Sequence, residues 1–394
     1  MSLASAWSDD PDTTRALSAC WEDLARKLPG PPSLVLVYGT EAHGLSELSA
    51  TMQELAGAVP WAGGTSCRGV MTEEGFHQGK HVVGMLGIYD PQGAYGVGAC
   101  AKGGSARNAG VEATNQALNA TGRPGERPTL LWLVSSPGDE ERVLSGIREV
   151  VGERVPVVGG SSADASVRGR WLQYAAGHQG NNSVVVVAMI SHGGLASHFH
   201  SGYQPTTLRA TVTAARGRTL LRLDGEPAAQ VYDRWTQGAL GDSAEGGPAL
   251  MRTTLHPLGR AVGEVSHLQT YLLSHPESVT EDGGLNLFTN VREGDELVLM
   301  EGSPQSLVSR AGRVAQVAQE ELQGPMAGAL VTYCAGCMLT VNEDMPAVVT
   351  SLRQAMPDKP FLGVFTFGEQ GCFPDGRSRH GNLMISVVCM SEVQ

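Results

Sequence analysis

The chain has 394 residues, more than the ~250–300 residues that one hydrophobic core usually spans, so its length predicts two domains or one large layered body. Its net charge of -12 disfavours a surface that binds nucleic acid, because such a surface needs an excess of basic side chains. The 51 glycines are nearly twice the average usage of about 7%, without the period of three found in collagen. Together with 41% hydrophobic residues, they predict a globular protein with many positions of close backbone approach or positive φ.

The N-terminal residues predict no secretion signal, because acidic residues stand where a signal peptide needs basic ones. No apolar run approaches the roughly 18 residues of a membrane span. Seven cysteines, an odd number in a long chain, indicate free thiols rather than a disulfide framework. We therefore expect a cytoplasmic protein that binds neither membranes nor nucleic acid.

A short motif with two glycines recurs along the chain. VPWAGGTS (59–66) and VPVVGGSS (155–162) share five of eight residues. A weaker copy, KPFLGVFT (359–366), keeps the proline, the first glycine and the final small hydroxyl residue. The chain is thus predicted to contain related units.

Similar elements surround each copy of the motif. Apolar strands are predicted before it, helices follow these strands, and a further apolar strand follows the motif. The strands before it are 34–37, 130–134 and 329–333, the helices are 45–55, 140–151 and 345–355, and the later strands are 82–89, 183–190 and 383–388. The predicted unit is strand, helix, short strand, small-residue loop, strand.

Residues 191–325 interrupt this rhythm. Short strands are predicted at 197–203, 210–215 and 220–223, as in an antiparallel ribbon. Glu226 and Pro227 are expected to open a helix, and Ser303 with Pro304 to begin another.

These elements predict an α/β (α+β) fold of layered mixed β-sheets, flanked by helices and built from internally repeated strand–helix–strand units. Three regions are expected. They are an N-terminal segment with the first helix (1–29), an N domain with two repeats (30–222) and a C domain (223–394).

In layered α/β folds, loops that leave the strands gather at one edge and line the ligand site. Glycines and small hydroxyl residues at such loops can present backbone N–H groups to an anion, although the same composition also marks ordinary turns. The predicted ligand-binding residues are Gly63, Gly64, Thr65, Ser66, Cys67, Gly159, Gly160, Ser161, Ser162, Thr366 and Glu369.

Glu369 lies between glycines and can act as a general base or hold an ammonium group, or be a solvated turn residue. Cys334 and Cys337 form a CxxC pair, the spacing of half a zinc site or of a redox dithiol, but also found for inert buried cysteines. If the protein is an enzyme, Cys334, Cys337 or Cys372 is the candidate nucleophile or acid, and Glu369 or His380 the base.

His198 and His200 share one face of a predicted strand, which could suit a metal or haem. Since no third ligand follows at a fixed spacing, we predict no metal site, and the sequence requires no cofactor. The chain also lacks a P-loop, a GxGxxG after a strand, a GxSxG elbow and an HExxH. Ordinary nucleotide and zincin chemistries are therefore disfavoured.

Several of these motifs together resemble the FIST family. Residues 63–66 and 157–164 resemble the small-residue motifs of its N domain. HSGYQP (200–205) and LDGEPAAQVY (223–232) are similar to the junction between the N and C halves. HPLG (256–259), VREGD (291–295), the cysteine motif at Cys334 and FTFGE (365–369) are similar to its C domain. The resemblance covers roughly residues 30–392.

This resemblance implies an intracellular sensory module that binds a small metabolite, with amino acids proposed as ligands and haem used by some members. It also implies a separate signalling partner or a homo-oligomer, since the chain leaves no room for a fused output or F-box domain. Cys337 stands where the family more often has an arginine, which favours thiol chemistry. A cysteine- or glutamate-dependent enzyme of lyase or hydrolase type and a haem-based gas sensor remain alternatives.

Overall fold

Within the described residues, three stretches of the chain follow the same order: strand, helix, strand, helix, strand, hairpin and closing strand. The structure is a computed structural model and describes residues 1–265 and 268–392. The first repeat contains β1 (Ser2–Ser8), α1 (Thr13–Lys27), β2 (Leu34–Gly39), α2 (Leu45–Ala56), β3 (Trp61–Thr65), β4 (Gly69–Thr72), β5 (Gly75–Gln78) and β6 (Val83–Tyr89).

The second repeat contains β7 (Ala94–Ala101), α3 (Ala106–Ala120), β8 (Leu130–Ser135), α4 (Glu140–Val151), β9 (Val157–Ser161), β10 (Gln173–Ala175), β11 (His178–Gly180) and β12 (Ser183–Ile190). The third contains β13 (Leu195–Ser201), α7 (Pro304–Glu321), β23 (Met326–Cys334), α8 (Ala335–Thr340), the 3₁₀ turn Asn342–Asp344, α9 (Met345–Ala355), β24 (Phe361–Thr366), β25 (Glu369–Cys372), β26 (Ser378–Gly381) and β27 (Met384–Ser391).

The repeats exchange their hairpins in a cycle. The three sheets have the strand orders β1-β6-β2-β3-β10-β11, β7-β12-β8-β9-β25-β26 and β13-β27-β23-β24-β4-β5. Each repeat therefore contributes four strands to its own sheet, while its hairpin completes the sheet of another repeat. The parallel pairs have matching registers, with Val35 opposite Trp61, Leu131 opposite Val157, and Ala329 opposite Phe361.

The three sheets share one apolar core, to which Leu36, Trp132 and Leu330 belong. Strands covered on both faces are almost continuously apolar, as in Ser183–Ile190, where every residue is buried. The helices cover the outer faces, since α4 buries Val143, Leu144 and Ile147 on one side at the spacing of an amphipathic helix. Burial on both faces makes the centre a solid core.

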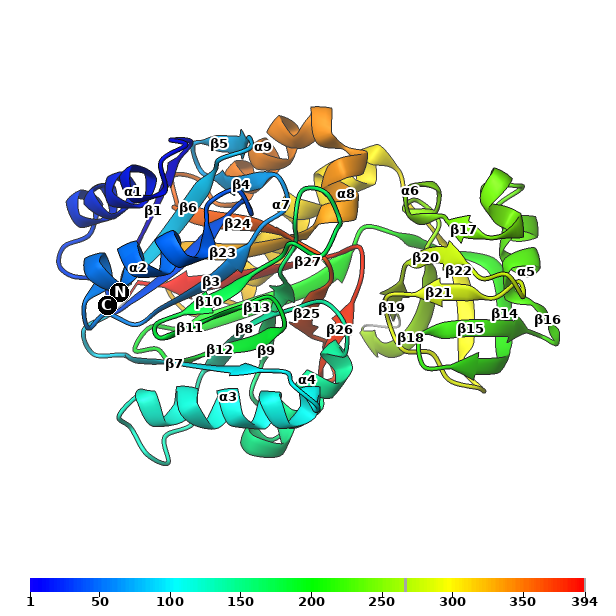
Figure 1. Ribbon diagram of the computed structural model, residues 1–394, viewed down its shortest axis with the longest axis horizontal. Helices are drawn as coiled ribbons and strands as arrows, with labels where there is room; N and C mark the ends of the chain where they lie inside the picture. The colour runs from blue at the N-terminus through cyan, green and yellow to red at the C-terminus, as the bar shows by residue number, and fades with distance from the viewer. Residues whose placement is uncertain (266–267, 393–394) are drawn as a thin grey trace.

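Residues 202–303 are inserted between β13 and α7 and form a lobe with its own core. Figure 1 shows this lobe at one end of the molecule and both chain termini at the other. Its elements are β14 (Gln204–Arg216), β15 (Thr219–Leu223), β16 (Glu226–Pro227), α5 (Ala228–Trp235), the 3₁₀ turn Gly241–Glu245, β17 (Gly247–Pro248), α6 (Leu250–Thr253), β18 (Leu258–Val265), β19 (Leu268–Ser274), β20 (Pro276–Val279), β21 (Leu285–Leu287) and β22 (Glu296–Glu301). These strands form one sheet of antiparallel pairs.

The predicted fold class and repeated units are confirmed. Two local details differ from the sequence analysis. β13 pairs with β27 and belongs to the third repeat, and Pro227 lies in β16 while the helix begins at Ala228. The boundary expected near Arg222 lies within β15, and the segment 1–29 supplies β1 and α1 of the first repeat.

Candidate functional site

A cavity of about 200 Å³ lies where the second and third repeats meet the inserted lobe. Its polar lining consists of Glu140, Arg218, His275, Glu277, Cys334, Thr366 and Asn382. Its apolar lining includes Trp171, Leu250, Met251, Phe288, Leu339 and Phe367. Met251 is 59% exposed and Val167, which also lines the cavity, is 46% exposed. Exposed apolar side chains beside an apolar cavity are typical of a ligand site.

The floor of the cavity is the point where β23 turns into α8. Cys334 ends the strand and is the N-cap of the helix, and Cys337 is the third helical residue. This spacing brings the two thiols close enough for each to shift the pKa of the other. Cys334 keeps 5% exposure and lines the cavity, whereas Cys337 is fully buried. One thiol of the pair can therefore be reached from the cavity.

Arg310 of α7 brings a buried positive charge to this pair. Its Nη1 donates to the carbonyl oxygen of Leu383 (2.7 Å), and its guanidinium carbon lies 4.8 Å from the ring centroid of Tyr333. Its Nε and Nη2 have no hydrogen-bond partner among the residues that the structure describes. The guanidinium thus has capacity left for a negative partner.

This environment determines the protonation state of Cys334 and Cys337. Burial alone raises the pKa of Cys337, but the contact with the Cys334 thiol and the charge of Arg310 outweigh it and bring the pKa below its ordinary value. Burial, followed by the contact with Cys337, raises the pKa of Cys334 well above its ordinary value. At neutral pH the pair therefore carries one proton and one negative charge, which Arg310 balances.

Tyr203 connects the dithiol to the inserted lobe. Its hydroxyl donates to the carbonyl oxygen of Thr254 (2.8 Å) and lies 3.6 Å from the sulfur of Cys337. The lobe also places His275 over the cavity floor, where its Nε2 lies 3.0 Å from the carbonyl oxygen of Leu250. Burial lowers the pKa of His275 to about 4, so this ring is neutral at pH 7.

Glu369 lies behind Thr366 and does not itself line the cavity. Thr366 Oγ1 donates to Oε1 of Glu369 (2.7 Å), and the backbone N–H of Met384 donates to Oε2 (3.0 Å). Because Glu369 is fully buried, its pKa rises to about 8 despite these bonds. The carboxyl group is thus mainly protonated at neutral pH.

Glu140 supplies a buried negative charge to another wall of the cavity. Ser161 Oγ and the backbone N–H of Gly138 donate to its Oε1 at 2.9 and 3.0 Å. Arg218, from the β14–β15 turn of the inserted lobe, donates to its Oε2 (2.6 Å) and to Glu141 (2.7 Å). This ion pair joins the lobe to the second repeat.

The charge of Glu140 persists to low pH. Burial alone raises its pKa, but the contact with His380 and the positive charges of Arg218 and Lys102 outweigh burial and lower the pKa to about 2. Arg218 is shared by Glu140 and Glu141, and a further carboxylate, that of Glu277, also lines the cavity.

The predicted glycine loops meet at the centre of the core. Backbone hydrogen bonds link each repeat to the next in a closed ring. Cys67 N donates to Phe365 O (3.1 Å), Ala163 N to Thr65 O (2.9 Å), and Phe367 N to Ser161 O (2.9 Å). Residues Gly63, Gly64, Thr65, Ser66, Cys67, Gly159, Gly160, Ser161 and Ser162 are buried here and do not line the cavity. Of the predicted loop residues, Thr366 does line it.

The glycines of these loops allow the repeats to approach one another. A Cβ at Gly64 would collide with Ser162 of the second repeat, and one at Gly160 would collide with Thr366 of the third. A Cβ at Gly63 would overlap the carbonyl group of Val37 in the neighbouring strand. Their main effect is close packing.

The other candidates from the sequence lie apart from the cavity lining. His380, on β26, accepts from Gln370 Nε2 (3.1 Å) and lies near Glu140, with 3.9 Å between His380 Nε2 and Glu140 Oε2. Cys372, at the end of β25, is half-buried, and burial raises the pKa of its thiol. His198 and His200 stack on β13, with ring centroids 6.2 Å apart.

Sequence reasoning missed Arg310, although the chain contained a signal for it. Arg310 falls three residues after Leu307 and four before Val314, on the apolar face of its helix. A basic residue at a core position of an amphipathic helix indicates a buried charge partner. Arg218 and Glu140 carried no comparable signal, because their pairing depends on how the lobe docks.

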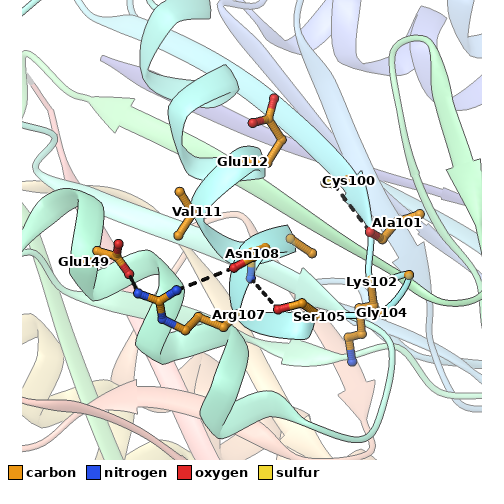
Figure 2. Close-up of a pocket in the computed structure, with 12 residues that line it drawn as sticks. Cys100, Ala101, Lys102, Gly104, Ser105, Arg107, Asn108, Val111, Glu112 and Glu149 are labelled. Carbon is orange, nitrogen blue, oxygen red and sulfur yellow. Dashed lines mark hydrogen bonds and ion pairs between the residues drawn. The ribbon is translucent and has the colours of Figure 1, made fainter.

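A larger but open groove lies at the N-terminal end of α3, with a volume of about 620 Å³. Figure 2 shows Arg107 reaching from this helix to Glu149, with which it forms an ion pair. Lys102 is buried and donates to the carbonyl oxygens of Ser136 (2.7 Å) and Gly138. Both cations of the groove are therefore already bound to other groups of the protein, and the cavity under the lobe is the better candidate for a ligand site.

Haem does not fit the candidate cavity. The volume of about 200 Å³ lies below the ~300 Å³ at which sites for drug-sized ligands begin, and its histidine, His275, is already hydrogen-bonded. The described part of the chain contains no group of three or more His, Cys, Asp or Glu side chains arranged to hold a metal ion. In the same residues, no helix is long and apolar enough to cross a membrane.

Comparisons with known proteins show distant structural likenesses. Among solved structures, cyanuric acid hydrolase from A. caulinodans matches with 10% identity and a TM-score of 0.35, covering 99% of this chain and all of that one. A second cyanuric acid hydrolase structure has 8% sequence identity and a TM-score of 0.35, with the same coverage. PurLQS from Thermotoga maritima has 8% identity and a TM-score of 0.23, and the match covers 99% of this chain and 72% of that one. Likeness at these TM-scores carries no argument about this protein.

No curated protein sequence matches the chain. Family models do match it: that of the FIST N domain covers residues 33–226, and that of the FIST C domain covers residues 228–372. These two matches span most of the sequence, in the order that the motifs predict. The chain belongs to the FIST family.

Proposed function

We propose that this FIST protein binds a small metabolite with an apolar body and an ammonium group, such as a free amino acid, in the cavity beneath the inserted lobe. FIST domains are themselves proposed to be sensory, small-ligand-binding domains. The observation that carries the proposal is the mainly apolar cavity, whose lining includes the exposed Met251 and Val167. A protein that binds a free amino acid reversibly can sense its concentration, so we propose a sensory role.

The size of the cavity limits the ligand. A volume of about 200 Å³ equals roughly seven water molecules at ~30 Å³ each. This suits a molecule of amino acid size and is too small for a nucleotide or a peptide. Trp171, Phe288 and Phe367 offer flat apolar surfaces for its side chain.

The charges of the cavity select the polar group of the ligand. Glu140 keeps its negative charge at neutral pH, and the two carboxylates that line the cavity, Glu140 and Glu277, face one lining cation, Arg218, so the lining favours a cation. Glu369 is mainly protonated and shielded by Thr366. We therefore assign the ammonium-binding role to Glu140 rather than to Glu369.

Isothermal titration calorimetry with individual L-amino acids tests this proposal. We expect saturable binding of an amino acid with an apolar side chain, and much weaker binding of the matching acid that lacks the ammonium group. No binding of any amino acid, or equal binding of both compounds, would contradict it.

The variant Gly336→Leu locates the site. A Cβ at Gly336 makes only ordinary contacts, the nearest at 3.4 Å from Leu383, so the larger side chain projects into the cavity without disturbing the helix. Gly104→Leu is the matched control, because Gly104 borders the groove of Figure 2 and a Cβ there meets nothing within 4 Å. We expect binding to be lost in the first variant and kept in the second, whereas the reverse result would place the ligand in the groove.

A further inference from the structure

We propose that Cys334 and Cys337 form a redox-active dithiol that closes to a disulfide when a small hydroperoxide enters the cavity. This activity is distinct from ligand binding and does not depend on it. Four observations support it: the spacing of the two cysteines, their unequal access, the buried charge beside them, and the shape of the cavity.

The spacing suits a disulfide. Cys334 is the N-cap of α8 and Cys337 the third helical residue, and residues three apart on a helix lie on the same face at about 5–6 Å between Cβ atoms. Each thiol also shifts the pKa of the other, so the two side chains lie close together. The bond can therefore form with a small rotation of the side chains and without rearrangement of the core.

The two cysteines have different access. Cys334 lines the cavity, whereas Cys337 is fully buried beneath it. A reagent in the cavity meets Cys334 first, and Cys337 is placed to resolve the product. The five other cysteines do not line the cavity, and among the described residues all seven are free.

Arg310 keeps the pair reactive. Its guanidinium is fully buried, leaves Nε and Nη2 without a hydrogen-bond partner among the described residues, and lies close enough to lower the pKa of Cys337. A buried cation of this kind needs a negative partner, and the monoprotonated dithiol provides one. The thiolate is the reactive form in thiol oxidation, and the Cys337 thiolate is placed to take the proton of Cys334 when Cys334 attacks.

The reaction balances as follows. Cys334 gives its proton to the Cys337 thiolate and attacks the terminal oxygen of the hydroperoxide, which forms a sulfenic acid and releases an alkoxide that takes a proton from water. Cys337 sulfur then attacks the Cys334 sulfur, and its proton leaves with the hydroxide as water. The two thiols lose two electrons in total, and the hydroperoxide is reduced to an alcohol and water.

The cavity selects the oxidant. Its small volume and its apolar lining admit a compact hydroperoxide, whereas a peptide disulfide such as oxidised glutathione is much larger than about 200 Å³. Fast oxidation by tert-butyl hydroperoxide and slow oxidation by oxidised glutathione are therefore expected. The reverse order would contradict this part of the proposal.

Peptide mapping of the reduced, full-length protein tests the dithiol. After treatment with tert-butyl hydroperoxide and alkylation, the tryptic peptide 314–353 should lose two hydrogen atoms and take up no alkyl group, because it contains Cys334 and Cys337 and no other cysteine. Dithiothreitol should reverse the change. If this peptide instead takes up two alkyl groups while the peptides of Cys100 or Cys372 are oxidised, the proposal is wrong.

Single variants assign the roles. Cys337→Ser should stop the reaction at a sulfenic acid on Cys334 that dimedone traps, and Cys334→Ser should abolish the fast reaction. Cys372→Ser is the matched control and should form the disulfide at the rate of the unmodified protein. Fast disulfide formation that disappears in Cys372→Ser would overturn the assignment. Should a variant fail to fold, the mapping of the unmodified protein still decides.

Discussion

Replacing Glu140 with glutamine should weaken the docking of the inserted lobe in a pH-dependent way. Glutamine keeps the shape of the side chain and can still accept from Ser161 Oγ and Gly138 N–H. It loses the charge that pairs with Arg218. The variant thus isolates the electrostatic part of this contact.

The size of the effect follows from the pKa of Glu140. A fall from the ordinary value of 4.5 to about 2, at about 1.4 kcal/mol per pKa unit, corresponds to about 3 kcal/mol at pH 7. Because the pKa is lower in the folded protein, this stability is present above pH 4.5 and is lost as the pH falls through 2. At pH 3, between the two pKa values, the charge of Glu140 contributes only about 1 kcal/mol to the free energy of unfolding.

Urea unfolding at pH 7 and pH 3 measures both values. We expect Glu140→Gln to lower the free energy of unfolding by about 3 kcal/mol at pH 7 and by about 1 kcal/mol at pH 3. Glu149→Gln is the matched control: its ion pair with Arg107 is half exposed and should contribute under ~1 kcal/mol. An equal loss for Glu140→Gln at the two pH values would refute the electrostatic origin.

Two further variants test the core and the dithiol. Gly160→Ala should lower the free energy of unfolding by about 1–3 kcal/mol, because its Cβ collides with Thr366 across two repeats, whereas Gly104→Ala should have little effect; urea unfolding compares them, and equal effects would contradict the packing argument. Arg310→Met should raise the pKa of the Cys337 thiol, because the variant removes the positive charge that stabilises the thiolate. Two opposite charges ~4 Å apart at an effective dielectric constant of ~20 attract by about 4 kcal/mol, which corresponds to a rise of up to about 3 pKa units. Thiolate absorbance at neutral pH should fall in this variant, and an unchanged titration would contradict the assignment of Arg310.

Sequence patterns predicted the repeated units well because the signals are local. The helices 140–151 and 345–355 and the strand 183–190 agree with the structure at both ends. Apolar periodicity and end signals lie within each segment, so no knowledge of its neighbours is needed.

The exchange of hairpins was not predictable in the same way. β4 pairs with β24, almost three hundred residues later, and β25 pairs with β9. Such pairings depend on the whole topology rather than on local propensity. The opening strand and helix of the second repeat were missed too, because AYGVGACA in β7 alternates small residues without a strong apolar signal.

The candidate site was predicted in part. The CxxC pair, Thr366 and Glu369 do lie close to one another, since Thr366 bonds Glu369 and both belong to the third repeat near Cys334. The glycine loops suggested a ligand site because exposed and packed glycines look alike in a sequence. The collisions that a Cβ would meet at these glycines arise only when neighbouring repeats are in place.

The site lies where the third repeat departs from the other two. Strand registers align Cys334 with Thr40 and Ser136, so the third repeat has a thiol where the others have buried hydroxyl groups. The inserted lobe also follows the first strand of this repeat and covers the same edge. A symmetric, solidly packed core offers no space for a ligand, and this local departure provides both the cavity and the reactive group at its floor. The chemistry of the protein should therefore depend on the third repeat and the lobe, while the other two repeats hold them in place.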